Sequence, residues 1–425
     1  MTPEVKQRIE QIQQGIVPKG YKKTKTDIVP ADWKESPIGE YIREYTEKTT
    51  IPNQYPVLTS ARTGLMLQTD YYSNRQVTTE DNVGYNVLPY GYITFRSRSD
   101  DGRFRFNENR IIERGIISYF YPVFSFSEEV CHEYVLYLLN FSIYRRMYPY
   151  AEGTAQQVLS LKKLGQLKYS LPLVAEQKKI AEILSTQDKA IELQGRKIEE
   201  LKRFKKGCLE KMFPRKGQKV PEKRFPGFTD DWEQRKLGDI ADIVGGGTPS
   251  TGNPSYWDGE IDWYAPAEIA DQIYANSSQK KITALGYENS SAKMLPPGTV
   301  LFTSRAGIGR TAILTRKGCT NQGFQSIVPH RGELDSYFIF SRTEELKRYG
   351  EFVGAGSTFV EVSGKQMAVM ELMMPPTMRE QQTIGGFFQQ LDHLITLHQR
   401  KLEEMKNQKK ALMQLLLTGI VRVRL

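Results

Sequence analysis

The feature that most constrains the fold is a long segment that occurs twice. Residues 171–213 reappear without a gap, 204 positions later, as residues 375–417, and fourteen of the 43 aligned positions are identical, among them Asp188 and its counterpart Asp392. A match of this length indicates an internal duplication. The chain is therefore expected to contain two copies of one structural unit.

Each copy predicts one long helix. Apolar residues recur at alternating steps of four and three, starting from Ile180 in the first copy and Ile384 in the second, which is the 3.5-residue period of a coiled coil. A lone helix of this kind would leave its apolar seam in water, so the two copies are expected to pair as an antiparallel coiled coil. Gln194 and His398 occupy equivalent seam positions, where polar residues often fix the register at some cost in stability.

Length and composition favour a globular protein with an anionic partner. A chain of 425 residues should form two or more domains. No apolar run is long enough to span a membrane and the N-terminus is polar, so a cytoplasmic location is expected. The three cysteines lie far apart and indicate neither a disulfide framework nor a zinc site. The net charge of +10 favours an acidic partner such as nucleic acid.

Part of that charge is concentrated in one stretch. Residues 196–224 carry twelve Lys or Arg against four Glu. The alternative to a binding role is a solvated outer face of the coiled coil, which is normally charged.

The segments between the helical copies have a different texture. They consist of short runs of aromatic and β-branched residues broken by Gly and Pro, which is typical of β-rich domains with some helix. Both open with a similar sequence, in which Trp33 and Trp232 precede an aliphatic residue, a glycine and an acidic residue at the same spacing. The expected fold class is α+β, and the expected parts are an N-terminal helical and linker segment 1–30, a first domain 31–170, a central helical region and linker 171–224, a second domain 225–373 and a C-terminal helical region 374–425.

Several short sequences carry a resemblance to a known family. They are the two Pro-x(3,4)-Glu-Gln-x-x-Ile helix starts, FTDDWEQRKLGDI, GGGTPST, LPPGTVLFTSRAGIG, TNQGF and the terminal LLLTGIVRV. Together, and in this order, they resemble the specificity subunit of type I restriction-modification systems. The resemblance covers nearly the whole chain, and the duplication strengthens motifs that are modest one by one.

The resemblance implies an architecture and a function. Two β-rich mixed α/β target-recognition domains would each bind half of a bipartite, asymmetric site in double-stranded DNA. The helical regions would separate these domains about an approximate two-fold axis, act as a ruler between the half-sites, and dock two modification (methyltransferase) subunits. Motor-nuclease restriction subunits complete such complexes, and S-adenosylmethionine, ATP and magnesium would bind to the partner subunits. No cofactor is expected in this chain.

Signatures of catalysis are missing from the sequence. It contains no G-x-x-x-x-G-K-[ST] phosphate loop and no Asn-Pro-Pro-aromatic or Asp-Pro-Pro-aromatic tetrapeptide of an adenine methyltransferase. The expectation is therefore a non-catalytic subunit. Two alternatives stay open: a stand-alone nuclease or methyltransferase with an unrecognised site, and a coiled-coil adaptor whose β-rich domains bind protein.

Reading DNA requires Arg and Lys for phosphates, and Arg, Asn, Gln, Ser or Thr for base edges. Arginines rank highest because their planar fork matches guanine and phosphate. For each residue an ordinary surface or turn role is the alternative. The candidates in the first domain are Arg62, Asn74, Arg75, Arg96, Arg98, Arg103 and Arg105, and those in the second are Thr248, Ser250, Lys280, Lys281, Ser304, Arg305 and Arg310. If Phe104 and Phe106 point into a core, Arg103 and Arg105 must face the other way.

Overall fold

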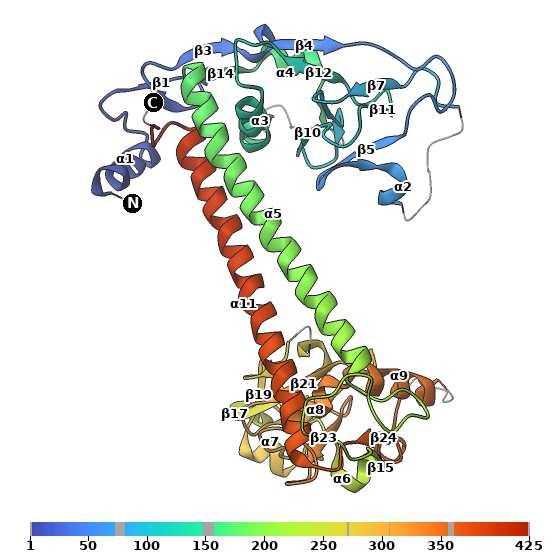
Figure 1. Cartoon of the computed structure of the whole chain (residues 1–425). Coiled ribbons are helices and arrows are strands. Elements are labelled where there is room, and N and C mark those ends of the chain that lie inside the picture. Colours follow the sequence, from blue (N-terminus) through green and yellow to red (C-terminus); the bar gives the residue numbers. More distant parts are fainter. Residues whose placement is uncertain are drawn as a thin grey trace. The chain divides into compact units, whose positions relative to one another are not determined.

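The computed structural model describes residues 2–72, 81–147, 157–269, 272–305, 307–355 and 361–423 (Figure 1). The chain divides into two compact units. Unit 1 comprises Met1–Leu193 and Leu402–Leu425, and unit 2 comprises Gln194–Lys401. Strands and helices occur together in each unit, which confirms the predicted α+β class.

Two long helices confirm the prediction made from the duplication. Helix α5 runs from Val174 to Lys211 and helix α11 from Met378 to Leu417. Each helix contributes to both units, because the division falls after Leu193 in α5 and after Lys401 in α11. The first apolar residues of each seam are buried, with Ile180, Leu184, Ile384 and Phe388 at most 2% exposed.

The helices pair in antiparallel orientation within each unit. In unit 2 the Gln194 side-chain amide donates to the backbone carbonyl of His398 at 2.8 Å and lies 2.9 Å from His398 Nδ1. Further along α5, Lys205 Nζ donates to Asp392 at 2.6 Å, so α11 runs the opposite way. Gln194 and His398 are duplicates of one another. The seam residue of one copy therefore meets its own counterpart in the other.

Unit 1 contains the matching ion pair. Lys409 of α11 donates to Asp188 of α5, and these two residues are the counterparts of Lys205 and Asp392. Each aspartate also receives a tyrosine hydroxyl from its own domain: Tyr137 donates to Asp188 at 2.6 Å, and Tyr337 donates to Asp392 at 2.9 Å. Within each unit, the helix pair therefore holds the domain through the same two contacts.

The domain of unit 1 is built on a four-stranded antiparallel sheet in the order β10-β8-β12-β4. Phe95, Phe106 and Phe124 pack together on this sheet and share a core with helix α3 and the apolar seam. The elements are α1 Pro3–Gln13, β1 Tyr21–Lys23, β2 Ile28–Pro30, β3 Lys34–Pro37, η1 Ile38–Glu40, β4 Ile42–Tyr45, β5 Leu58–Ala61, β6 Gly64–Leu67, α2 Gln68–Tyr71, β7 Asn86–Pro89, β8 Ile93–Phe95, β9 Arg98–Ser99, β10 Phe106–Glu108, β11 Arg114–Ile117, β12 Val123–Phe126, α3 His132–Met147, β13 Gln157–Val158, α4 Leu161–Gln166 and β14 Lys168–Leu171.

The domain of unit 2 has a five-stranded sheet in the order β16-β23-β20-β21-β18 and a three-stranded sheet in the order β19-β17-β22. Phe302, Phe338 and Phe388 are fully buried in the core that the five-stranded sheet shares with the start of α11. The elements are β15 Glu233–Lys236, α6 Leu237–Ile240, β16 Ala241–Gly245, η3 Pro254–Tyr256, β17 Trp257–Tyr264, η4 Pro266–Glu268, β18 Tyr274–Ala275, β19 Lys280–Ile282, α7 Ala284–Glu288, β20 Val300–Phe302, β21 Thr311–Leu314, β22 Cys319–Thr320, β23 Gln325–Pro329, α8 Ser336–Ser341, α9 Thr343–Gly354, α10 Gly364–Ala368 and β24 Glu371–Met374.

The repeated glycine after each opening tryptophan has a packing role. A side chain on Gly39 would come within 2.9 Å of the Gly165 backbone, and one on Gly238 would come within 2.9 Å of the Ala368 side chain. Both glycines therefore allow a short helix to approach the segment just before the long helix of the same copy. The shared spacing in the sequence reflects this shared close approach.

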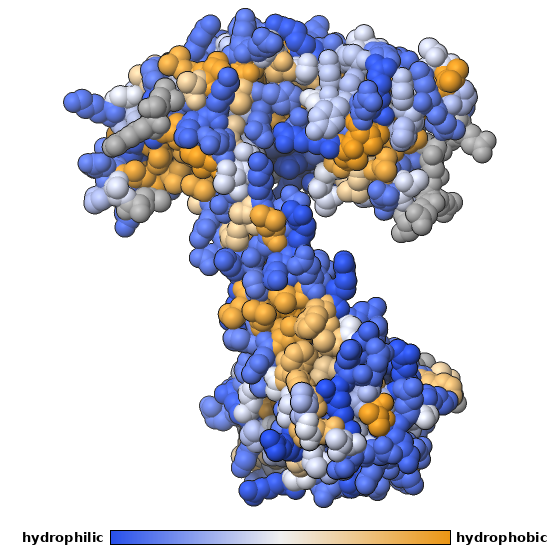
Figure 2. Space-filling view, viewed as in Figure 1, coloured by the Kyte–Doolittle hydropathy of each residue, from blue (hydrophilic) through white to orange (hydrophobic). Residues whose placement is uncertain are grey.

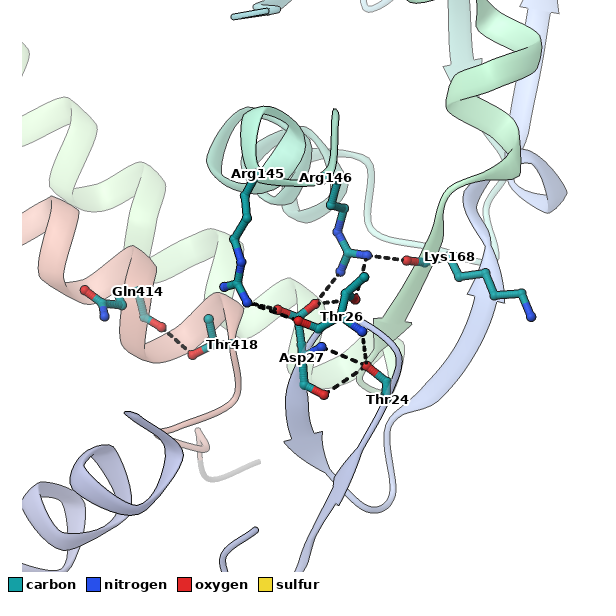
Figure 3. Close-up of polar contacts among 8 residues, drawn as sticks. All are labelled: Thr24, Thr26, Asp27, Arg145, Arg146, Lys168, Gln414 and Thr418. Carbon is teal, nitrogen blue, oxygen red and sulfur yellow. Dashed lines mark hydrogen bonds and ion pairs between the residues drawn. The ribbon is translucent and has the colours of Figure 1, made fainter. Parts of the chain in front are cut away.

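The N-terminal segment of unit 1 is held by polar contacts with the rest of that unit. Figure 3 shows Arg145 and Arg146 of α3 converging on Asp27, at 3.2 and 2.8 Å. The Tyr21 hydroxyl donates to the Gly419 carbonyl at 2.7 Å, beyond the end of α11. A groove of about 720 Å³ lies among these elements, and its charged arginines are already bound to Asp27.

A buried glutamate at the start of each long helix binds an arginine that follows the other helix. In unit 1, Glu176 receives two hydrogen bonds from Arg422, at 2.7 and 2.6 Å, and these hydrogen bonds raise the pKa of Arg422. In unit 2, its counterpart Glu380 receives two from Arg224, at 2.7 and 2.8 Å, and one from the Trp232 indole. In both units, therefore, an equivalent buried ion pair links the start of one long helix to the segment that follows the other.

Substitution of Arg224 by alanine should destabilise unit 2. Glu380 has an exposed side-chain fraction of 1%, and removing one partner of a buried ion pair costs about 3 kcal/mol or more, because the remaining charge stays unpaired. Denaturant titration of the full chain should show a lower midpoint for Arg224→Ala. The control is Arg215→Ala, which removes an exposed pair with Glu222 and should cost less than about 1 kcal/mol. Equal effects of the two variants would contradict this account.

Candidate nucleic-acid interface

Two of the predicted arginines of unit 1 share one carboxylate. Arg62 Nη2 lies 2.7 Å from Asp101, and Arg103 Nε lies 3.9 Å from it. Asp101 also accepts hydrogen bonds from the Ser99 hydroxyl and the Arg103 backbone N–H. Desolvation alone would raise the pKa of Asp101, but these hydrogen bonds and Arg62 lower it. Asp101 therefore stays charged and holds both arginines.

Arg103 and Arg105 alternate with buried aromatic residues, as the sequence predicts. Phe104 and Phe106 are buried, whereas both arginines are exposed. The Arg105 side chain as a whole is exposed, but partial desolvation of its guanidinium lowers the pKa of Arg105, and the charge of Asp188 on α5 opposes this. Arg105 therefore lies within electrostatic reach of α5. Asn74 and Arg75 lie outside the described residues.

Arg96 and Arg98 have aromatic neighbours. Arg98 Cζ lies 4.6 Å from the centroid of the Phe120 ring. Burial raises the pKa of Tyr121, and the positive charge of Arg96 opposes that rise, so these two side chains interact. Within the described ranges, neither Arg96 nor Arg98 has a carboxylate within 4.0 Å, and both are exposed.

Exposed tyrosines lie near the aromatic neighbours of these two arginines. Tyr119 is 62% exposed and packs on Phe120, with ring centroids 4.2 Å apart. Tyr71 and Tyr72 form an edge-to-face pair at 4.8 Å, and both interact electrostatically with Tyr121. These tyrosines were not among the residues predicted from the sequence to contact DNA. The Tyr-Phe-Tyr sequence before Pro122 was the available signal for an exposed aromatic turn.

The structure brings together several of the predicted residues of unit 2. The Thr248 hydroxyl donates to the Gln322 side chain. The Trp257 indole donates to the Ser250 carbonyl at 3.1 Å, and Lys280 Nζ lies 5.8 Å from the Trp257 ring. Thr248 and Ser250 are thus fixed on either side of Pro249, and Lys280 lies beside them over an aromatic ring.

The other predicted residues of unit 2 differ from one another in their burial and in their contacts. Lys281 Nζ lies 3.8 Å from Asp262, which also binds Arg316 at 2.6 Å. Ser304 is fully buried, and its hydroxyl has no hydrogen-bond partner among the described residues. Arg305 forms a backbone bridge with Glu361, and Arg310 is exposed. Ser304 can contact DNA only if the strands around it move.

Other kinds of site were also considered. Among the described residues, no group of three or more His, Cys, Asp or Glu side chains is placed to hold a metal ion. No helix in the described part of the chain is long and apolar enough to cross a membrane. Hydrophilic residues cover most of the surface seen in Figure 2.

Comparison with known proteins points to one family. Residues 30–203 and 229–407 match a family model described as "Type I restriction modification DNA specificity domain". The chain is 29% identical over 299 residues to the putative type I restriction enzyme MjaX specificity subunit of Methanocaldococcus jannaschii, which covers 68% of each chain. It is 36% identical over 168 residues to the MjaIX specificity subunit of the same organism, and this match spans only 39% of that relative.

Solved structures share the fold. The S subunit of a type I restriction-modification system from M. genitalium has a TM-score of 0.55 at 13% identity, covering 91% of this chain and 96% of that one. A chain from a structure of type I R-M complex assembly and conformational transition has a TM-score of 0.56 at 16% identity, covering 92% and 99%.

Replacing Asp262 by asparagine should lower the stability of unit 2 in a pH-dependent way. Burial would raise the pKa of Asp262, but hydrogen bonds from Ser278 and Arg316 outweigh it and lower the pKa below 3.8. The charged carboxylate therefore stabilises the fold above about pH 4, and this contribution disappears as the pH falls through the folded-state pKa. Denaturation of Asp262→Asn and the parent should differ by about 1–3 kcal/mol at pH 7 and converge in acid. A difference that does not depend on pH would contradict this.

Proposed function

Because this chain belongs to the type I restriction-modification DNA specificity family, we propose that it is the subunit through which a restriction-modification complex recognises its DNA sequence. The observation that carries the proposal is that the family model matches twice, over residues 30–203 and 229–407. Each match contains one β-rich domain and most of one long helix. The chain therefore offers two modules of the same kind.

Two modules with unlike surfaces suit a bipartite and asymmetric site. In unit 1 the exposed candidate side chains are arginines beside tyrosines. In unit 2 they are hydroxyl, amide and lysine side chains around Trp257. Different side-chain sets read different base edges, so each unit would bind a different half-site on one duplex. The net charge of +10 suits the phosphates, and raised salt should weaken binding.

The proposed DNA contacts are the side chains that the sequence singled out. The carboxylate contacts divide them into two groups. Arg62, Arg103 and Lys281 are bound to Asp101 or Asp262 and would position loops or contact phosphates. Six others have no carboxylate within 4.0 Å among the described residues and would be available to bind DNA, namely Arg96, Arg98, Arg105, Lys280, Arg305 and Arg310.

Partner subunits would supply the chemistry. The relatives are named as specificity subunits of type I restriction enzymes, and the duplicated helices offer two equivalent surfaces for two modification subunits. S-adenosylmethionine would bind to those subunits, and ATP and magnesium to motor-nuclease subunits. The chain itself would be a non-catalytic protein of the cytoplasm. A stand-alone nuclease or methyltransferase is the alternative, and it would require the purified chain to cut or methylate DNA with magnesium and S-adenosylmethionine alone.

Exchange of one domain tests the proposal. Residues 31–170 should be replaced by the equivalent domain of a relative, and the chimera co-expressed with the modification subunits in a host that lacks adenine methylation. Sequencing of modified bases should give a motif in which one half is new and the other is retained, because each unit reads alone. The reciprocal exchange of residues 225–373 is the control and should change the opposite half. A chimera in which both halves change together would contradict the proposal.

A further inference from the structure

One arginine of unit 1 differs from every other described arginine that lies over an aromatic ring. Five of these six arginines also have an oxygen partner. Arg8 donates to the Ile420 carbonyl, and Arg103, Arg114, Arg146 and Arg342 each have a carboxylate within 4.0 Å. Within the described ranges, Arg98 has the Phe120 ring alone.

This difference matters because of the shape of the guanidinium group. It is planar, and its five N–H donors lie around its edge. A carboxylate partner binds that edge, whereas an aromatic ring binds the face. The ring contact of Arg98 therefore orients the group and leaves its donors free. At exposed sites such a contact is worth about 0.5–1 kcal/mol, which is enough to favour one orientation.

Three hydrogen bonds hold the turn that carries Phe120. The Ser97 backbone N–H donates to the Phe120 carbonyl at 3.0 Å. The Thr94 hydroxyl donates to the Pro122 carbonyl, and the Asn86 amide donates to the Tyr121 carbonyl, both at 2.9 Å. Arg98 itself lies in β9, paired with Val158 of β13. Strand pairing therefore holds Arg98, and hydrogen bonds hold Phe120. A residue that recognises a ligand needs such a rigid support.

The surroundings favour a polyanion over a protein as the partner. Arg96 and Arg98 both carry charge that no described carboxylate within 4.0 Å neutralises. Their aromatic neighbours Tyr121 and Phe120 lie near the exposed rings of Tyr71, Tyr72 and Tyr119. A positive surface without nearby acidic groups attracts phosphates. Exposed tyrosines provide apolar area for base methyl groups or ring faces without adding negative charge.

We propose that Arg98 is a specificity-determining residue that reads a guanine in the half-site bound by unit 1. The inference rests on the proposed function, since it requires this unit to bind duplex DNA. Guanine presents two acceptors, O6 and N7, in the major groove, and an arginine edge matches both. Arg96, which has no such ring contact, would bind a neighbouring phosphate.

The decisive variant is Arg98→Lys, because lysine keeps the charge and loses the planar fork. Expressed with the modification subunits, the parent should methylate a bipartite motif with a guanine in the half that depends on unit 1. Arg98→Lys should lose discrimination at that guanine by roughly tenfold to a hundredfold and keep the rest of the motif. An unchanged motif, or a uniform fall in methylation without loss of base preference, would overturn the proposal.

Arg145→Lys is the matched control. Arg145 is an exposed arginine of the same unit, and its edge is bound to Asp27 at 3.2 Å (Figure 3). This variant should leave the motif unchanged. If it relaxed the same guanine, the change in Arg98→Lys would reflect general charge chemistry and the proposal would fail.

A second measurement changes the DNA base as well as the protein. In binding assays with the parental complex, 7-deazaguanine at the assigned position removes the N7 acceptor while keeping base pairing. Affinity should fall by roughly tenfold for the parent, and the fall should disappear in Arg98→Lys. An undiminished affinity of the parent would overturn the role of Arg98 and leave sequence recognition intact. A parental complex that bound every sequence equally would instead refute the proposed function.

Discussion

The pairing of two equivalent helices is the constraint on which the rest of the structure depends. When duplicated helices pair in antiparallel orientation, a contact between residues that both copies retain occurs twice, once on each side of the central position. The Lys205–Asp392 and Lys409–Asp188 ion pairs show this directly. Gln194 and His398, which are counterparts, meet each other. A single register of α5 against α11 therefore forms both ion pairs. Sliding one helix along the other would break both pairs together.

The chain termini take part in the same scheme. Glu176 and Glu380 are buried at equivalent positions, and a buried carboxylate needs a charged partner. In unit 2 that partner, Arg224, comes from the linker after α5, and in unit 1 it is Arg422, after α11. The contacts of Tyr21 and Arg8 with residues 419 and 420 then join the N-terminal segment to this end of the chain. Although the two domains have different surfaces, each unit is therefore held together by the same buried glutamate–arginine pair.

Much of this framework could be predicted from the sequence, and the reading surface could not. The 3.5-residue period of the duplicated segment is a local property of the sequence, so α5, α11 and their polar seam residues could be predicted from it. Alternation predicted that Arg103 and Arg105 face away from Phe104 and Phe106 if these are in a core, and both phenylalanines are buried. The partner of an arginine, however, is decided by residues distant in the sequence. Asp101 binds Arg62 across 39 positions, and Phe120 lies under Arg98 only because the sheet brings the two turns together. Burial of Ser304 likewise follows from strand packing.

We propose, as the family resemblance implies, that the paired helices set the spacing between two independently read half-sites. The most direct test removes the equivalent heptads 191–197 and 395–401, which preserves the phase of the seam and both lysine–aspartate pairs. Seven helical residues span about 10.5 Å, or roughly three base pairs at 3.4 Å each. Sequencing of modified bases should return the same two half-sites with a spacer shortened by about three base pairs. A motif with its original spacer would contradict the account.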